Sequence, residues 1–205
     1  MYTRYLKDSG YEKNINVYDK RLAQIISNKY LKGEIVVDIG CAYGNLVEAF
    51  NQLGYRGIGI DNDNDAHVIC NKKGIKFYKC DVDKEKLPLK TKSIDNITCF
   101  HVLEHLWDIQ RFVKECHRVL KNSGVIVFLV PNWEKMYKNY WDNYTHVTPI
   151  SKNRLKNLLD ANGFKIIDMK GFKKPDWVKL IWRYFDFPFF MNWNFFLCVA
   201  EKKGD

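Results

Sequence analysis

EIVVDIGCAYGNL (residues 34–46) joins a continuous apolar run to a glycine-containing turn and the first residues of a helix. The run is rich in β-branched residues and ends at Gly40, which is typical of a strand buried on both faces. Between Gly40 and Gly44 the backbone can turn tightly and approach a ligand closely. A buried strand, a glycine turn and a helix in this order predict the first unit of an α/β fold.

Four more short apolar runs follow this unit, separated by stretches of helical pattern. We expect strands over 55–61, 75–81, 94–100 and 124–132. We expect helices over 45–53, 65–73 and 107–120, and an amphipathic helix upstream over 14–31. Strands that alternate with helices imply right-handed crossovers and a parallel sheet with helices on both faces.

The pattern changes after Pro131. A loop rich in Trp and Tyr is expected over 133–149. It is followed by a helix that Ser151 caps and that ends at Ala161, before Asn162-Gly163. Two further strands are expected over 164–172 and 193–203, which brings the predicted sheet to seven strands.

An aromatic segment over 175–191 separates these last two strands, and its apolar residues have helical spacing near 176–185. Internal packing, a homodimer contact and peripheral contact with a membrane surface are alternatives for it. The sequence does not fix the oligomeric state.

The composition is that of an ordinary globular protein, with 46% apolar and 28% charged residues in 205. No apolar run reaches the roughly 18 residues that a spanning helix needs, and the N-terminus lacks an apolar stretch. The six cysteines are scattered without a C-x-x-C pair, which favours reduced thiols over a disulfide frame. We expect a single cytoplasmic domain.

Positive charge is concentrated in the second half of the chain. Residues 1–110 carry 16 basic and 15 acidic side chains, whereas residues 111–205 carry 17 basic and only 9 acidic ones. The second half therefore suits a surface that meets an anionic partner. A lysine-rich solvated face is the alternative.

Polar residues recur where the predicted parallel strands end, at the edge where ligands bind in open α/β sheets. Asp61 follows the second strand, about 20 residues beyond the glycine turn, a spacing that suits hydrogen bonds to ribose hydroxyls. Asp81-Val82 follow the third strand and could contact an adenine through a carboxylate and a backbone N–H. Phe100 and His101 follow the fourth.

VVDIGCAYGNL, GIGID, KCDVD and SIDNITCFHVLEHLWD, taken in this order, resemble the motifs of the class I S-adenosylmethionine-dependent methyltransferases. The resemblance covers residues 34–172 and extends weakly to the last strand, and the stretch 146–167 is similar to the branch near the ubiquinone and menaquinone enzymes. It implies a Rossmann-like, mostly parallel seven-stranded sheet whose last strand is antiparallel. It also implies a helical cap over 1–33, a cofactor-binding half over 34–132 and a substrate-side half over 133–205.

The resemblance further implies which residues would bind S-adenosylmethionine. One set of residues would bind the methionine part, the ribose, the adenine and the region of the sulfonium. These residues are Asp38, Gly40, Cys41, Gly44, Asp61, Asn62, Asp81, Val82, Phe100 and His101. Ala42 departs from the family, in which many members have a glycine, but it adds only a methyl group. A nicotinamide cofactor would need G-x-G-x-x-G, which Ala42 and Asn45 do not match.

His101, Glu104 and His105 spell H-x-x-E-H, which is also an inverted zinc-protease motif. A protease is disfavoured because His101 directly follows a predicted buried strand. Some relatives with E-x-x-E-H bind magnesium, but His101 replaces the first glutamate here, and nitrogen ligands suit zinc, iron or manganese better. We expect no bound metal, with His101, Glu104, His105 and His146 as the candidate ligands if one binds.

The predicted function is methyl transfer to a small-molecule acceptor with S-adenosylhomocysteine as product. An anionic sugar, a lipid-linked intermediate and a quinone precursor are acceptor classes that suit the basic second half. His146 is the first candidate for a general base and His101 the second, because imidazole titrates near neutrality. The alternatives are an RNA methyltransferase, which the basic half favours but for which no RNA-binding module is evident, and a non-catalytic cofactor-binding regulator.

Overall fold

The sheet of the computed structural model has seven strands in the order β3-β2-β1-β4-β5-β7-β6. The structure describes residues 14–171 and 194–204. The strands are β1 (Ile35–Ile39), β2 (Arg56–Asp61), β3 (Lys76–Lys79), β4 (Ile94–Phe100), β5 (Leu120–Pro131), β6 (Phe164–Gly171) and β7 (Phe195–Lys202). Strands β1 to β5 are parallel, and β7 pairs antiparallel with both β5 and β6. The predicted fold class, including the antiparallel last strand, is confirmed.

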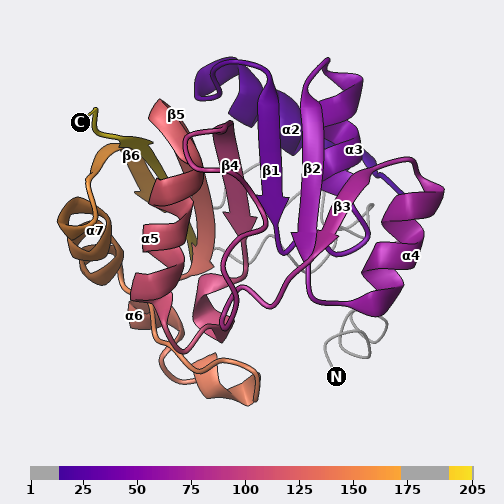
Figure 1. Cartoon of the computed structure of the whole chain (residues 1–205). Helices are drawn as coiled ribbons and strands as arrows, with labels where there is room; N and C mark the ends of the chain where they lie inside the picture. Colours follow the sequence, from indigo (N-terminus) through magenta and orange to yellow (C-terminus); the bar gives the residue numbers. More distant parts are fainter. Residues whose placement is uncertain (1–13, 172–193, 205) are drawn as a thin grey trace, which may run out of the picture.

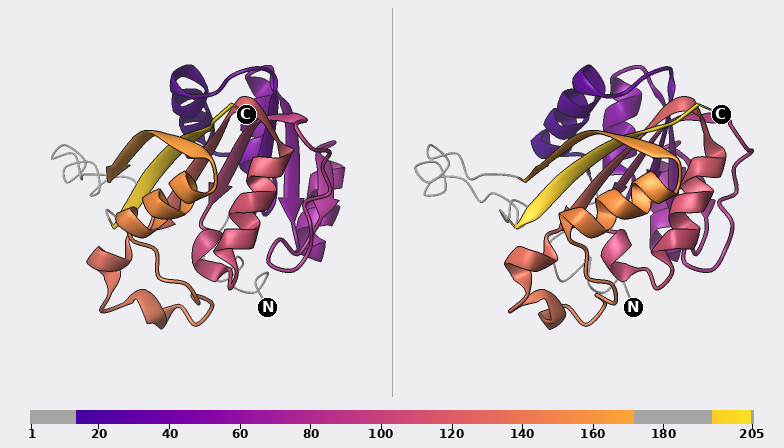
Figure 2. Two further views of the ribbon diagram at one scale, coloured as in Figure 1. Left: turned by 60° about the vertical axis from the view of Figure 1, so that its left-hand side comes forward. Right: turned by 90° about the vertical axis from the view of Figure 1, so that its left-hand side faces the viewer.

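Helices cover both faces of this sheet (Figures 1 and 2). The helices of the described residues are α2 (Val17–Lys29), α3 (Asn45–Gln52), α4 (Asn64–Lys72), η1 (Leu103–His105), α5 (Ile109–Val119), α6 (Trp133–Met136), η2 (Tyr140–Asp142) and α7 (Lys152–Ala161). In the right-hand view of Figure 2, α2 lies on one side of the sheet and α7 on the other. No helix within the described ranges has the length and apolar character needed to cross a bilayer.

Alternating side chains of β5 divide the core into two layers. Val125 and Val127 belong to the cluster that packs against α2 and α3. Ile126 and Phe128 belong to the cluster that packs against α5 and α7. All four are fully buried, because a central parallel strand is covered on both faces.

The expected helices and strands are present with ends shifted by a few residues. One segment has a different secondary structure from the one expected. The stretch 133–149, expected to be a loop, contains the short helices α6 and η2. Asn132 caps α6 by accepting a hydrogen bond from the Glu134 N–H, a local signal in a stretch too short to show periodicity. The aromatic segment 175–191 and its expected helix lie outside the described residues.

The strand order reverses between β1 and β4, which are neighbours in the sheet although β2 and β3 separate them in sequence. The crevice for a ligand in such a sheet lies beyond the carboxyl ends of these strands. In Figure 1 the arrows of β1 and β2 point down, and the segment from α6 to η2 lies below that same edge. The topology therefore places the turn 40–44 and the segment after β5 at one end of the molecule.

Packing, as well as backbone conformation, requires glycine at position 44. Gly44 has φ +72°, and an added Cβ would lie 2.7 Å from Ile75 Cδ1 and 2.8 Å from Cys70 Sγ. Gly74 has a similar φ of +68°, but an added Cβ there would meet nothing within 4 Å. The two glycines thus separate backbone strain from steric crowding.

We predict that Gly44→Ala lowers the free energy of unfolding more than Gly74→Ala does. Strain in the left-handed backbone should lower the free energy of unfolding of each variant by about 1 kcal/mol. Steric crowding should lower that of Gly44→Ala by about a further 1–3 kcal/mol. Urea denaturation followed by circular dichroism measures both. Equal losses in the two variants would show that the turn is not packed against Ile75 and Cys70.

Candidate cofactor site at the carboxyl edge of the sheet

The turn after β1 is fixed by hydrogen bonds to the end of β2. The Gly40 N–H donates to the Ile60 carbonyl at 2.8 Å, and the Ala42 N–H donates to Asp61 Oδ2 at 2.9 Å. Asp61 Oδ1 accepts from the Asp63 N–H at 3.1 Å. The Asp61 side chain therefore holds both its own strand end and the neighbouring turn in place.

The backbone of this turn is left-handed at three positions. Gly40 and Gly44 have φ values of +78° and +72°, and Ala42 has φ +46°. A side chain is strained in this region, so Ala42 is tolerated at some cost. An added Cβ on Gly40 would lie 2.3 Å from Val102 Cγ2, which explains why that position has none.

Asp38 is a buried carboxyl group in β1, with 5% of its surface exposed. Thr98, its register partner in β4, donates its hydroxyl to Asp38 Oδ1 at 2.6 Å. Burial raises the pKa of Asp38 to about 7, against the lowering effect of the Thr98 hydrogen bond. Burial likewise raises the pKa of Asp61, although the Ala42 and Asp63 N–H groups oppose it.

Two buried acids with raised pKa values suit a ligand that brings positive charge. A cation near them would restore the charged form that burial disfavours. The amino group and the sulfonium of S-adenosylmethionine are such cations, and its ribose offers hydroxyl donors. The residues present therefore fit this cofactor.

The segment after β3 lies beside the end of β2, because the Cys80 N–H donates to the Asp61 carbonyl at 2.9 Å. Asp81 is half-buried and forms an ion pair with Lys84 at 2.9 Å. The Val82 carbonyl accepts from Arg111 at 2.8 Å, which anchors this segment to α5. The structure thus brings Asp81 and Val82 to the predicted edge.

Cys41 is predicted from the sequence to bind the cofactor, but its side chain is not open to a ligand. Its side chain is 3% exposed and packs in a cluster with Val47 and Cys70. An added Cβ on Gly59 would lie 2.6 Å from Cys41 Sγ, so the thiol points down onto β2. Only the backbone of Cys41 could face a ligand.

His101 occupies the first position after β4, with φ +55°. Its N–H donates to the Leu129 carbonyl at 2.9 Å, and its ring meets the Phe195 ring edge-on at 4.7 Å. His101 Nδ1 lies 3.4 Å from Glu104 Oε1. Strand β4 thus places His101 at the carboxyl edge of the sheet, and the Glu104 carboxylate contacts its ring at Nδ1.

A second histidine pair lies next to Glu104. The rings of His105 and His146 have centroids 5.1 Å apart, although the two residues are far apart in sequence. The Val147 and Thr148 N–H groups donate to the Glu104 carbonyl at 2.8 and 3.1 Å, which brings the two segments together. The structure therefore brings together the four residues predicted as candidate metal ligands.

The ionisation of this group differs from residue to residue. Burial alone would raise the pKa of Glu104, but the His101 hydrogen bond and the charges of His101 and His105 lower it below its usual value. Burial lowers the pKa of His146, against the attraction of Glu104. These contacts favour the charged form of Glu104, whereas burial favours the neutral form of His146.

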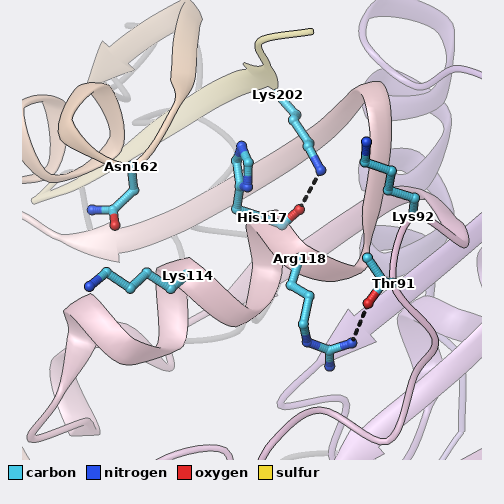
Figure 3. Close-up of a pocket in the computed structure, with 7 residues that line it drawn as sticks. All are labelled: Thr91, Lys92, Lys114, His117, Arg118, Asn162 and Lys202. Atoms are coloured by element: carbon cyan, nitrogen blue, oxygen red, sulfur yellow. Dashed lines mark hydrogen bonds between the residues drawn. The ribbon is translucent and has the colours of Figure 1, made fainter. Parts of the chain in front are cut away.

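A hollow of about 390 Å³ lies at the opposite end of the sheet (Figure 3). Its lining residues are Thr91, Lys92, Lys114, His117, Arg118, Asn162 and Lys202. Lys202 is buried there and donates to the His117 carbonyl at 2.8 Å. This basic lining would repel a sulfonium, so the hollow does not match the predicted cofactor site.

Sequence reasoning missed Thr98 and Val102. Thr98 matters because it faces Asp38 across the β1–β4 pairing, and Val102 because it packs against Gly40. Both contacts depend on the pairing of strands that are distant in sequence. Only the correct sheet order, with β4 beside β1, could have indicated them.

The known proteins to which this chain is similar in sequence are described as methyltransferases. A sequence profile described as a methyltransferase domain matches residues 11–169. A protein of Mycolicibacterium smegmatis, described as a probable S-adenosylmethionine-dependent methyltransferase, is 32% identical over 68% of this chain and 55% of its own length. The ubiquinone biosynthesis O-methyltransferase of Coxiella burnetii is 34% identical over 74% of this chain and 72% of its own length. The chain thus spans about half the length of the mycobacterial relatives it matches.

Solved structures share the fold at low sequence identity. A methyltransferase from Archaeoglobus fulgidus aligns over 98% of this chain and 99% of its own, with a TM-score of 0.74 and 23% identity. One from Mesorhizobium loti aligns over 90% of this chain and 98% of its own, with a TM-score of 0.71 and 20% identity. At these identities the likeness establishes the architecture.

We predict that Asp38 makes the free energy of unfolding decrease as pH rises. Its pKa is 3.8 in ordinary surroundings and about 7 in the fold, so between these values the folded state holds a proton that the unfolded state lacks. The contribution of Asp38 to the free energy of unfolding is therefore complete below about pH 4. It decreases toward pH 7 by about 1.4 kcal/mol per pH unit.

The isosteric variant Asp38→Asn keeps an acceptor for Thr98 but cannot titrate. Urea denaturation of both proteins across this pH range measures the difference in their free energies of unfolding. The stability of the wild type relative to Asp38→Asn should fall as pH rises. A constant difference would show that Asp38 titrates as an ordinary exposed carboxylate.

Proposed function

Because this chain belongs to the family of class I S-adenosylmethionine-dependent methyltransferases, we propose that it binds S-adenosylmethionine at the carboxyl edge of its sheet and transfers the methyl group to a small-molecule acceptor. One observation carries the proposal. The buried acids Asp38 and Asp61 flank a left-handed turn at the point where strand order reverses. Such an edge offers a cationic nucleoside both hydrogen-bond acceptors and bare backbone.

Each part of the cofactor has residues suited to it. Asp61 would accept the ribose hydroxyls, and Asp38 would face the amino group of the methionine part through the turn 40–44. Asp81 and the Val82 N–H would hold the adenine. The cofactor supplies an activated methyl group, and the protein's share of the work is to align the acceptor with it and to remove the acceptor's proton.

His101 is the better placed of the two predicted bases. His146 Nδ1 lies 2.7 Å from the Tyr140 carbonyl and Nε2 lies 3.3 Å from Asn143 Nδ2, so protein groups contact both of its ring nitrogens. Its lowered pKa also weakens it as a base. His101 follows β4 directly at the switch point, so we assign proton removal to His101.

An oxygen nucleophile on an anionic small molecule is the acceptor class we favour. The similarity to a ubiquinone biosynthesis O-methyltransferase over 74% of this chain supports an oxygen acceptor. The excess of 17 basic over 9 acidic residues in 111–205 supports a negative charge on it. The exposed rings of Tyr137, Trp141 and Tyr144 lie in the segment after β5 and could cover an aromatic ring.

We predict that Asp61→Ala weakens S-adenosylmethionine binding by about 1.5–3 kcal/mol, the cost of losing charge-assisted hydrogen bonds. Calorimetric titration of the full chain measures the affinity. The control is Asp160→Ala, because Asp160 is an exposed residue of α7 whose carboxylate pairs with a surface lysine, Lys203, at 2.8 Å. Unchanged affinity in Asp61→Ala, with the fold intact by circular dichroism, would remove Asp61 from the site.

We predict that His101→Asn slows methyl transfer by about 10²- to 10⁴-fold. Asparagine tolerates the left-handed backbone at this position, so the change removes the imidazole without added strain. Release of S-adenosylhomocysteine with a panel of hydroxylated benzoates measures the rate, and calorimetry measures cofactor affinity. The rate should fall far more than the affinity. Wild-type turnover in His101→Asn would show that the imidazole removes no proton in the rate-limiting step.

A further inference from the structure

The hollow at the amino edge of the sheet, where β4 and β5 begin, has a positively charged lining (Figure 3). Its volume is about 390 Å³, and it is formed by the loop before β4, helix α5, the end of α7 and the end of β7. Four of its seven described lining residues are lysine or arginine, and none of the seven is aspartate or glutamate. A lining of this kind suits an anionic ligand.

Arg118 fixes one wall of this hollow. Its guanidinium donates to the carbonyls of Leu87 and Leu89, each at 3.0 Å, and pairs with Glu115 at 2.8 Å. These contacts join α5 to the segment before β4, and the Glu115 carboxylate balances the Arg118 charge. Arg118 Nη1 also lies 3.3 Å from Thr91 Oγ1, and that hydroxyl keeps its own hydrogen to donate. The wall is therefore built before any ligand binds, and it includes a hydroxyl donor.

Lys202 places a buried cation in the lining. Only 2% of the residue is exposed, and its ammonium donates to the carbonyls of His117 and Leu120 at 2.8 and 3.0 Å. Lysine is rarely buried to this extent, because removing its charge from water is costly. The Lys202 charge therefore adds to the positive potential of the hollow from a position that dissolved salt screens poorly.

Lys92 has a backbone conformation that disfavours its own side chain. Its φ is +50°, in the left-handed region where glycine is unstrained and lysine is strained. Its N–H donates to the Arg118 carbonyl at 2.9 Å, which fixes the turn against the end of α5. The turn thus carries a lysine where glycine would be the more stable residue. A role for the charged side chain would account for this choice.

Capping of a helix end explains only part of the charge in the lining. Lys202 contacts the last carbonyls of α5, which is a favourable position for a cation. Lys114, however, lies more than one turn before the end of α5 at Val119, and Lys92 lies in a turn. In Figure 3 these two exposed lysines lie on opposite sides of His117. Capping does not account for them, whereas an anion bound between them would.

We propose that this hollow binds a small anion that carries two or more phosphate groups. Phosphate oxygens are strong acceptors, and lysine binds them as a point charge. The volume of about 390 Å³ falls in the range of roughly 300–1,000 Å³ that small-molecule pockets have, so it is large for a single phosphate. The hollow lies at the opposite edge from the candidate cofactor site, so this proposal does not depend on methyl transfer.

Two lysines would contact the phosphate oxygens directly, Lys92 from the turn and Lys114 from α5. An ammonium has three N–H donors, so each lysine can bind a ligand alongside a protein partner. Thr91 would donate its hydroxyl hydrogen. Asn162 Nδ2 donates one hydrogen to the Leu158 carbonyl at 2.7 Å and would donate its second to the ligand.

Calorimetric titration of the full chain with inorganic pyrophosphate tests the site. The buffer contains no phosphate, and its ionic strength is kept constant because salt weakens contacts between exposed charges. The wild type should bind one equivalent. Lys114→Gln and Lys92→Asn should each weaken binding by about tenfold, through the loss of one charge-assisted contact. Glutamine preserves the helix at 114, and asparagine tolerates the left-handed backbone at 92.

Lys20→Gln is the matched control. Lys20 is an exposed lysine of α2, which lies on the other face of the sheet from α7, and its removal changes the net charge equally. Orthophosphate and citrate should both bind more weakly than pyrophosphate. Saturating S-adenosylhomocysteine should leave the affinity for pyrophosphate unchanged, because it would bind at the opposite edge.

The proposal would be overturned if the wild type bound no pyrophosphate at millimolar concentration. Equal weakening in Lys20→Gln would also overturn it, since net charge alone would then explain the binding. Unchanged affinity in both folded hollow variants, or displacement by S-adenosylhomocysteine, would place the anion elsewhere. Orthophosphate or citrate binding as tightly as pyrophosphate would contradict a site for linked phosphate groups.

Discussion

The buried carboxylate of Asp61 accepts backbone N–H groups from two segments, Ala42 in the turn after β1 and Asp63 after β2. This interaction fixes the left-handed turn in register with the end of the neighbouring strand. The same turn needs glycine at 40 and 44, because Val102 and Ile75 occupy the space that side chains would take. The candidate cofactor site therefore depends on a few close approaches of bare backbone, which the parallel pairing of β1 with β2 and β4 imposes.

Asp38, Asp61 and Glu104 are buried acids at this edge, and their pKa values are shifted in different directions. Asp38 and Asp61 have raised pKa values because burial outweighs their hydrogen bonds, so they suit a ligand that supplies positive charge. Glu104 has a lowered pKa because His101 and His105 stabilise its charge, yet one of its oxygens has no hydrogen-bond partner in the described residues. Asp38 and Asp61 suit a cationic nucleoside, whereas Glu104 contacts His101 after β4.

The order of helices and strands could be predicted because strands buried on both faces leave continuous apolar runs, as in β1 and β5. The edge residues Asp61 and Asp81 could be predicted because parallel strands end at one edge. The contact of Thr98 with Asp38 could not, since it depends on which strands are neighbours. The two short helices in 133–149 are too brief to show periodicity, and they bring His146 to His105. The contact between His105 and His146 therefore depends on the tertiary path of a segment that the sequence alone presents as a loop.

A crystal structure of the full chain with S-adenosylhomocysteine would show directly where the cofactor binds. We expect the ribose hydroxyls to lie within hydrogen-bonding distance of the Asp61 carboxylate, with the amino acid part against the backbone of residues 40–44. Density for the ligand in the basic hollow of Figure 3, or over the sheet edge with Asp61 out of reach, would contradict this expectation.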